Sequence, residues 1–194
     1  MQEHDGATYE GEGDDIPKVS ENALQEGETY FIDGSSSINP ETGEKHVGMA
    51  IVWMEEDSYE TIVQKRLPSH YSAQAAELTA LIEALHTAKG CTVTIYSDSA
   101  YATTTVDSGL SRWHRRVFRR ADGSPVQHPT LLNELIEALA ETSVVAVVKC
   151  QAHTNNTDAF SLGNAAADAA AKEALYFNVS PRLSALLKQP SQNH

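Results

Sequence analysis

The sequence contains few cysteines and aromatic residues, and it has no long apolar run. Its only two cysteines among 194 residues, Cys91 and Cys150, are too few for a disulfide framework or a four-cysteine zinc site. We expect both to be buried free thiols. No stretch approaches the roughly 20 apolar residues of a membrane-spanning helix, so no membrane partner is expected. The N-terminal residues are neither basic nor apolar, which excludes a secretory signal and favours an intracellular location, cytoplasmic or nuclear.

Basic residues are scarce as well, but they are unevenly distributed. The chain has 14 Lys and Arg residues against 27 Asp and Glu residues, a net charge of −13. Residues 1–28 hold nine of the acids, one base and few large apolar side chains, which predicts an acidic disordered arm or linker. A folded domain is expected over 29–176, followed by a tail or linker over 177–194. Five arginines and Trp113 lie within residues 112–120, called the basic segment below.

Hydrophobic periodicity predicts an α/β domain. Strands are expected at 28–32, 47–54, 61–67, 92–96 and 144–149. Helices are expected at 72–88, 99–107, 129–140 and 164–175, with polar loops at 35–44 and 151–162. Ser72 is a suitable N-cap for the first helix, and Gly90 follows its C-terminus. Three antiparallel strands followed by alternating helices and strands predict a mixed five-stranded sheet with helices on both faces.

Four acidic residues have unusual positions in these elements. Asp33 and Asp98 follow predicted strands, whereas Glu77 and Asp168 lie within predicted helices near apolar residues. Taken singly, each has an ordinary explanation as a turn, cap or surface residue, and Asp168 could pair with Lys172 four residues later. Brought together, they would form an all-oxygen site of the kind that Mg²⁺ or Mn²⁺ prefers. Two such ions make a phosphoryl-transfer site.

The segments around these acids, taken in order, resemble ribonuclease H. The similarity is strongest to the domain found in retroviral and retroelement reverse transcriptases, particularly the gammaretrovirus-like ones. The segments are Tyr30-Phe31-Ile32-Asp33-Gly34-Ser35-Ser36, Ser72-Ala73-Gln74-Ala75-Ala76-Glu77-Leu78, Tyr96-Ser97-Asp98-Ser99-Ala100-Tyr101-Ala102, and Ala152-His153 followed by Gly163-Asn164 and Asp168. They cover about residues 30–176. The basic segment and the helix after it are similar to the basic protrusion of that branch.

This resemblance implies a ribonuclease H-like fold and an endonuclease that hydrolyses the RNA strand of RNA–DNA hybrids without sequence specificity. It implies two Mg²⁺ ions, which Mn²⁺ can replace, held by the four catalytic carboxylates Asp33, Glu77, Asp98 and Asp168. His153 matches a loop histidine that assists product release or proton transfer. The implied substrate contacts are Gly34, Ser35 and Gln74 on the RNA strand, Ser99 and Tyr101 on the DNA strand, and Arg112, Trp113, Arg115 and Arg116 in the basic segment.

Other interpretations stay open at this point. One is a catalytically silent domain of retroelement origin that binds nucleic acid without cutting it. A second is another enzyme of the wider superfamily, such as an integrase, transposase or exonuclease, and a third is a structural segment of a polyprotein. If the chain is part of a retroelement polyprotein, a polymerase and an integrase are its expected neighbours and a virion-like particle is a further expected location.

Overall fold

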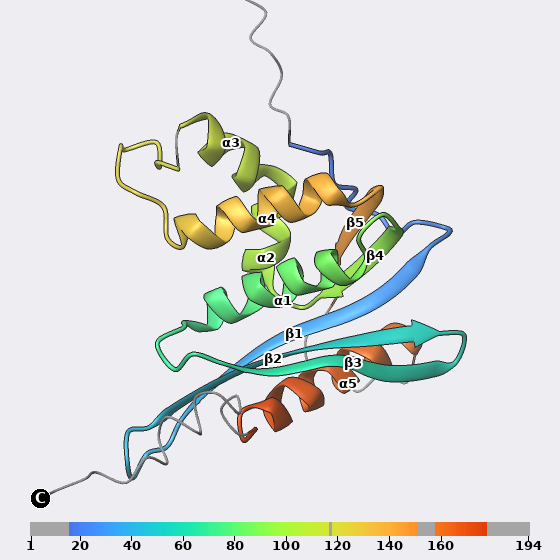
Figure 1. Ribbon diagram of the computed structural model, residues 1–194, viewed down its shortest axis with the longest axis vertical. Helices are drawn as coiled ribbons and strands as arrows, with labels where there is room; N and C mark the ends of the chain where they lie inside the picture. The colour runs from blue at the N-terminus through green and yellow to red at the C-terminus, as the bar shows by residue number, and fades with distance from the viewer. Residues whose placement is uncertain (1–15, 117, 151–157, 178–194) are drawn as a thin grey trace, which may run out of the picture.

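A mixed sheet lies at the centre of the computed structural model, which describes residues 16–116, 118–150 and 158–177 (Figure 1). The elements are β1 (Glu28–Ile38), β2 (Lys45–Glu55), β3 (Ser58–Leu67), α1 (Ala73–Thr87), β4 (Thr92–Ser97), α2 (Ala100–Thr104), the π-helical turn η1 (Thr105–Gly109), α3 (Leu110–Arg115), α4 (Pro129–Glu141), β5 (Val144–Lys149) and α5 (Ala159–Ala174). None of these helices is both long and apolar enough to cross a lipid bilayer.

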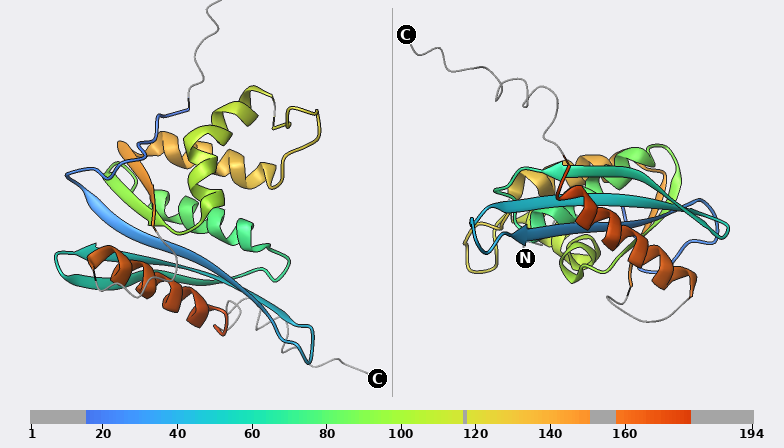
Figure 2. Two further views of the ribbon diagram at one scale, coloured as in Figure 1. Left: turned by 180° about the vertical axis from the view of Figure 1, so that it is seen from behind. Right: turned by 90° about the horizontal axis from the view of Figure 1, so that it is seen from below.

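The described strands form one sheet in the order β3-β2-β1-β4-β5. The first three strands pair antiparallel, whereas β1 pairs parallel with β4 and β4 parallel with β5. Helices α1 and α4 lie on one side of the sheet and α5 on the other (Figures 1 and 2). This arrangement confirms the predicted α/β class and the mixed five-stranded sheet.

Two apolar clusters hold these layers together. The larger one joins α1 and α4 to the sheet and includes Ile32, Leu81 and Leu135, none of which is exposed to solvent. A smaller cluster under α5 contains Phe31 and Tyr96, whose rings stack with centroids 5.0 Å apart. Burying each large apolar side chain stabilises the fold by about 1.5–3 kcal/mol. The helices are therefore held on both faces independently of any ligand.

Small residues let α5 lie unusually close to the sheet. A Cβ atom at Gly163 would stand 2.4 Å from the ring of Phe31. A Cβ atom at Gly48 in β2 would stand 2.9 Å from the carbonyl oxygen of Ala171. The many alanines of α5 add little bulk on this face, so the helix backbone can approach the strands.

Several predicted boundaries are wrong. Strand β1 continues into the first part of the expected loop, as far as Ile38, because its serines pair with the equally long β2. The helix expected to end at residue 107 continues through η1 into α3. Helix α5 begins at Ala159 instead of 164, because the side chain of Asp158 accepts a hydrogen bond from the Ser161 N–H at 2.9 Å and caps its first turn.

The predicted signals at the two ends of the first helix are confirmed, whereas the prediction that both cysteines are buried is not. The Ser72 hydroxyl accepts a hydrogen bond from the Ala75 N–H and caps α1, and Gly90 after this helix has a positive φ of 75°. Cys150 is half-buried, but Cys91 is exposed because it lies in the turn between α1 and β4 instead of inside the strand.

The segment before β1 lies against the outer edge of β5. The Ser20 N–H donates to the Val145 carbonyl and the Val147 N–H donates to the Ser20 carbonyl, both at 3.0 Å. Ile16 and Val19 pack against the larger apolar cluster. This stretch falls within the arm predicted for residues 1–28, and the boundary of the folded domain stays a prediction.

Candidate metal centre

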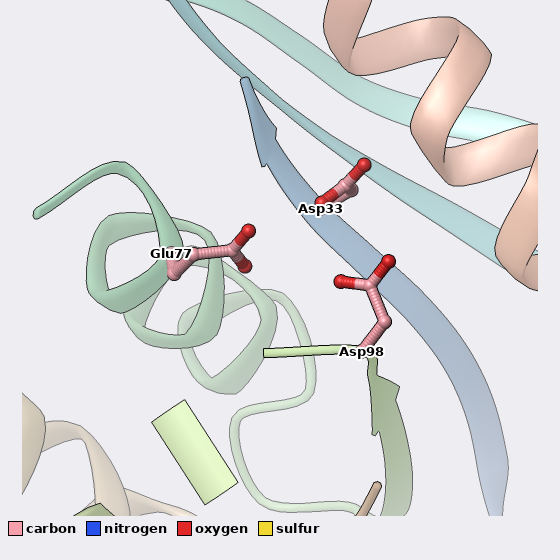
Figure 3. Close-up of side chains that lie close together, drawn as sticks. All are labelled: Asp33, Glu77 and Asp98. Atoms are coloured by element: carbon pink, nitrogen blue, oxygen red, sulfur yellow. The ribbon is translucent and has the colours of Figure 1, made fainter. Parts of the chain in front are cut away.

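Three carboxylates from different parts of the chain meet beside the middle of β1. Asp33 belongs to β1, Glu77 to α1, and Asp98 comes directly after β4. Each offers an oxygen, and these oxygens all lie within 4.8 Å of one another. Figure 3 shows the three side chains pointing toward a common point between the two strands and the helix.

Strand pairing places the two aspartates side by side. Asp33 does not end its strand, contrary to the prediction, but the parallel ladder between β1 and β4 ends just before it with the pair Ile32 and Ser97. The next residue on each strand is therefore an aspartate without a partner in that ladder. Here β4 turns away into α2 while β1 continues, which opens the sheet where both carboxylates lie.

A close approach of α1 to β1 brings Glu77 to the same point. A Cβ atom at Gly34 would stand 2.8 Å from both the Ala76 carbonyl carbon and the Glu77 nitrogen. Any larger residue at this position would push the helix away from the strand. Glycine therefore sets the short distance between the Asp33 and Glu77 side chains.

The electrostatic environment disfavours three negative charges at this point. Burial raises the pKa of Asp33, and the nearby charges of Glu77 and Asp98 raise it further. Burial also raises the pKa of Glu77, and the charge of Asp98 adds to this effect, although hydrogen bonds from Asp33 and from the Gly34 N–H lower it. Without a cation, Asp33 and Glu77 therefore retain protons into the neutral range.

The donor set fits a divalent cation. Asp33 is only 4% exposed, and Glu77 Oε2 is buried with no hydrogen-bond partner within the described part of the chain. A buried carboxylate oxygen without a partner is costly, and a cation beside it would remove that cost. Because all the donors are oxygens, the residues suit Mg²⁺ or Mn²⁺ and not zinc.

The fourth predicted carboxylate, Asp168, lies next to this group but outside it. It projects from α5, and a hydrogen bond with Asp168 contributes to raising the pKa of Asp33. Its Oδ2 accepts a hydrogen bond from the Lys172 ammonium at 2.9 Å, one helical turn later. Both the pairing with Lys172 and the proximity to the other acids are thus observed, and the metal-binding role of Asp168 stays a prediction.

The predicted substrate residues fall into two groups around the three acids. Gly34 and Ser35 follow Asp33 in β1, and Gln74 is exposed in the first turn of α1. Ser99 follows Asp98 and caps α2 by accepting a hydrogen bond from the Ala102 N–H. Tyr101 is half-buried in α2, where burial raises its pKa and the nearby Arg120 lowers it.

The basic segment lies away from the acids. Helix α3 lies at the opposite end of the molecule from α5 (Figures 1 and 2). Arg112 and Arg115 in α3 and its C-cap Arg116 are exposed. Trp113 is only half-exposed, because its ring packs close to Gly109 and against the larger apolar cluster. The arginines are thus available to solvent, whereas Trp113 helps to attach the helix.

The sequence placed Cys150 near a strand and Asn164 in the last motif, but it did not predict that these two residues contact each other. Cys150 follows β5, and its thiol donates a hydrogen bond to Asn164 Oδ1 in α5 at 3.4 Å. Asn164 is only 5% exposed, and its position four residues before Asp168 within the last motif was the signal that the sequence offered. His153, in contrast, was predicted from sequence but lies outside the described residues.

Comparisons with known proteins agree with this arrangement. A family model described as RNase H matches residues 25–176. The Gag-Pol polyprotein of baboon endogenous virus (strain M7) is 35% identical over 146 residues, which are 75% of this chain but only 8% of that polyprotein. The solution structure of the PFV RNase H domain has 25% sequence identity and a TM-score of 0.66, covering 77% of this chain and 94% of that domain. The foamy viral protease-reverse transcriptase in complex with RNA/DNA hybrid has 21% identity and a TM-score of 0.63, covering 84% of this chain and 22% of that one.

Proposed function

This chain belongs to the ribonuclease H family, and we propose that it is a metal-dependent endonuclease that cuts the RNA strand of RNA–DNA hybrids. The observation that carries this proposal is that oxygens of Asp33, Glu77 and Asp98 lie within 4.8 Å of one another, and that a buried Glu77 oxygen has no hydrogen-bond partner among the described residues. Such a cluster is stable as three anions only with cations beside it. An enzyme is therefore favoured over a domain that merely binds nucleic acid.

Asp33, Glu77 and Asp98 would hold Mg²⁺ ions, with Asp168 completing the set when it exchanges its Lys172 contact for an ion. When bound, two Mg²⁺ ions supply an activated water nucleophile and stabilise the leaving oxygen of the phosphodiester. The protein's own contribution is to hold the carboxylates in place and to position the RNA phosphate over them. His153 remains a predicted helper in product release or proton transfer.

Strand choice would follow from the shape of the substrate. An RNA–DNA hybrid has a wide minor groove and carries 2′-hydroxyl groups on one strand only. Gly34, Ser35 and Gln74 would contact those hydroxyls on the RNA strand, while Ser99 and Tyr101 would contact the DNA strand. Contacts to sugars and phosphates carry no base information, so cleavage would not depend on sequence.

The exposed arginines of the basic segment would bind the hybrid away from the cut. Arg112 and Arg115 lie on α3 and Arg116 is its C-cap, at the opposite end of the molecule from α5. Phosphate contacts at that distance would orient a duplex and make its binding dependent on salt. The relatives are Gag-Pol polyproteins and a protease-reverse transcriptase, so we also propose that this domain works with a polymerase. An integrase neighbour stays a prediction from the sequence.

A cleavage assay on a labelled hybrid tests the proposal. With Mg²⁺ present, the RNA strand should be shortened while the DNA strand, an RNA duplex and a DNA duplex stay intact, and a chelator should stop the reaction. Asp98→Asn should lower the rate more than about 100-fold, because it removes a negatively charged ligand. The matched control is Asp57→Asn, in the exposed turn between β2 and β3, which should cleave like the unmodified protein.

Two outcomes would overturn the proposal. Binding of the hybrid without any cleavage in Mg²⁺ or Mn²⁺ would support the silent binding domain instead. Strand transfer on DNA alone would support an integrase-like enzyme. Cleavage that Asp98→Asn leaves unchanged would refute the assignment of the site.

A further inference from the structure

A chain of hydrogen bonds connects the strand end that carries Asp98 with the helix that carries Asp168. It begins at Ser97, which is fully buried and whose Oγ accepts from the Ser99 N–H at 3.1 Å. The backbone on both sides of Asp98 is thereby held. The Ser97 carbonyl in turn accepts a hydrogen bond from the Cys150 N–H at 2.9 Å, one step beyond the β4–β5 ladder.

The side chain of Cys150 continues this connection to α5. Its Sγ donates to Asn164 Oδ1 at 3.4 Å, a normal distance for a thiol donor. Cys150 also packs against the small apolar cluster of Phe31 and Tyr96, so its position is fixed by packing as well. The link therefore joins the residue after β5 to α5.

Asn164 and Asp168 are four residues apart, and so they lie on the same face of α5. Asn164 is buried in a helix made mostly of alanine, where a polar side chain without a partner costs about 1–3 kcal/mol. The hydrogen bond from Cys150 is thus needed for α5 to pack on the sheet in its observed position and rotation. A shift of Asn164 along or around the helix axis would move Asp168 with it.

The thiol is suited to a donor role at neutral pH. Burial raises the pKa of Cys150 to about 11, and the negative charge of Asp98 contributes to this increase. The sulfur therefore keeps its proton in the pH range where the enzyme is proposed to work. Protonated sulfur can donate to the amide oxygen, whereas a thiolate would lose this hydrogen bond.

We propose that Cys150 and Asn164 are positioning residues that set the place of Asp168 relative to Asp98, and thereby the affinity of the site for divalent ions. This inference rests on the proposed function, because it assumes that Asp168 joins the other three carboxylates in holding metal. Neither residue touches the substrate or the reacting atoms. They act through Asp98 and Asp168, because their hydrogen bonds orient the end of β4 and helix α5.

The test measures metal affinity in a double-mutant cycle. Mn²⁺ binding is followed by calorimetry on the protein without nucleic acid, and the Mg²⁺ concentration for half-maximal hybrid cleavage is measured in parallel. Cys150→Ala and Asn164→Ala should each weaken Mn²⁺ binding about 10-fold, the usual effect of removing a group that orients metal ligands. The double variant should be no weaker than either single variant, because one contact is lost in all three.

Two further variants separate positioning from stability. Cys150→Ser keeps a donor of similar size and should restore Mn²⁺ affinity to within about twofold of the unmodified protein. Cys91→Ala, at the exposed cysteine, is the matched control and should change nothing. Additive losses in the double variant, or lower unfolding stability with unchanged Mn²⁺ affinity, would show that the two residues only pack, and would overturn the inference. If the unmodified protein binds Mn²⁺ without cleaving, the proposed function fails while the cycle still tests the link. A protein that binds no Mn²⁺ would refute both.

Discussion

At the scale of single residues, Asp33 is a buried carboxyl group in an unfavourable electrostatic environment. Its carboxyl is only 4% exposed and has Glu77 and Asp98 as neighbours. Because its pKa is raised in the folded state, the folded protein binds protons that the unfolded chain releases. Stability from this group is complete below the ordinary pKa of 3.8 and is lost as the pH rises toward the folded value. The metal-free protein should therefore become less stable between pH 5 and pH 8.

Replacing this residue should stabilise the metal-free protein. We expect Asp33→Asn to increase the free energy of unfolding at pH 7 by about 1–3 kcal/mol, because the amide still forms hydrogen bonds and is neutral at every pH, so folding no longer requires the uptake of a proton at this position. Thermal unfolding in a chelator, from pH 5 to pH 8, should show a melting temperature raised by roughly 2–4 °C per kcal/mol. The variant should also depend less on pH than the unmodified protein.

Exposed Asp57→Asn serves as the control for that measurement and should leave the pH dependence unchanged. Added Mg²⁺ should stabilise the unmodified protein more than it stabilises Asp33→Asn, because only the unmodified protein offers the Asp33 carboxylate as a charged ligand for the ion. An Asp33→Asn protein that is less stable than the unmodified one at pH 7 in chelator would contradict the electrostatic explanation.

At the scale of elements, the close approach of α5 to the sheet depends on Gly163. Its Cα faces the ring of Phe31, which stacks on Tyr96 and contacts Tyr59 edge-on at 6.3 Å. These three rings come from three strands, so the ring of Phe31 cannot move aside freely. The helix therefore has one position on this face, and that position also places Asn164 and Asp168.

We expect Gly163→Ala to lower the free energy of unfolding by about 1–3 kcal/mol, because the added methyl group would overlap the Phe31 ring. Urea unfolding measures this change. The control is Ala165→Val, which adds volume on the exposed side of the same helix and should cost less than about 1 kcal/mol. If Gly163→Ala were as stable as the unmodified protein, the close packing of α5 would not limit its position.

At the scale of the whole molecule, charge is separated along the chain. Residues 1–28 carry a net charge of −8, whereas the basic segment holds five arginines on α3 and in the turn after it. The carboxylates of the proposed metal centre account for a further part of the negative charge. Ions at the centre would neutralise that part, so the N-terminal acids remain as the main source of repulsion toward a nucleic acid.

Removing the first 15 residues should therefore strengthen hybrid binding. This deletion takes away six acidic residues and no lysine or arginine. Fluorescence anisotropy with a labelled hybrid, in the Asp98→Asn background to prevent cleavage, should show affinity raised about two- to fivefold at low salt. The difference should vanish near 0.5 M salt, where charges are screened within about 4 Å.

A control protein of full length has these six acids replaced by Asn and Gln. Its hybrid affinity should match that of the deletion, which separates the effect of charge from the effect of chain length. Deleting through residue 24 instead should reduce stability, because it removes the packing of Ile16 and Val19 and the Ser20 pairing with β5. Equal hybrid affinity in all of these proteins would show that the acidic residues do not repel the substrate.

Local sequence by itself determined the helices, the alternation of elements and the candidate acids. Helix α1 could be predicted because its signals depend on neighbours within a few positions. These signals are its apolar spacing, its Ser72 cap and Gly90 after its end. Asp33 and Asp98 stood out because they follow predicted strands, and Glu77 because it lies near apolar residues of the first helix. The order of the motifs around them identified the family.

Only the tertiary structure decided how these residues meet. The end of β1 depended on the length of β2, and the opening at Asp33 on where the ladder with β4 stops. The distance from Glu77 to Asp33 depended on the close approach at Gly34, and the position of Asp168 on the Cys150–Asn164 contact. Each of these features joins residues far apart in the chain or fixes a rotation of a packed helix. Helix periodicity and capping act over a few residues, whereas strand pairing and packing are set by the whole fold.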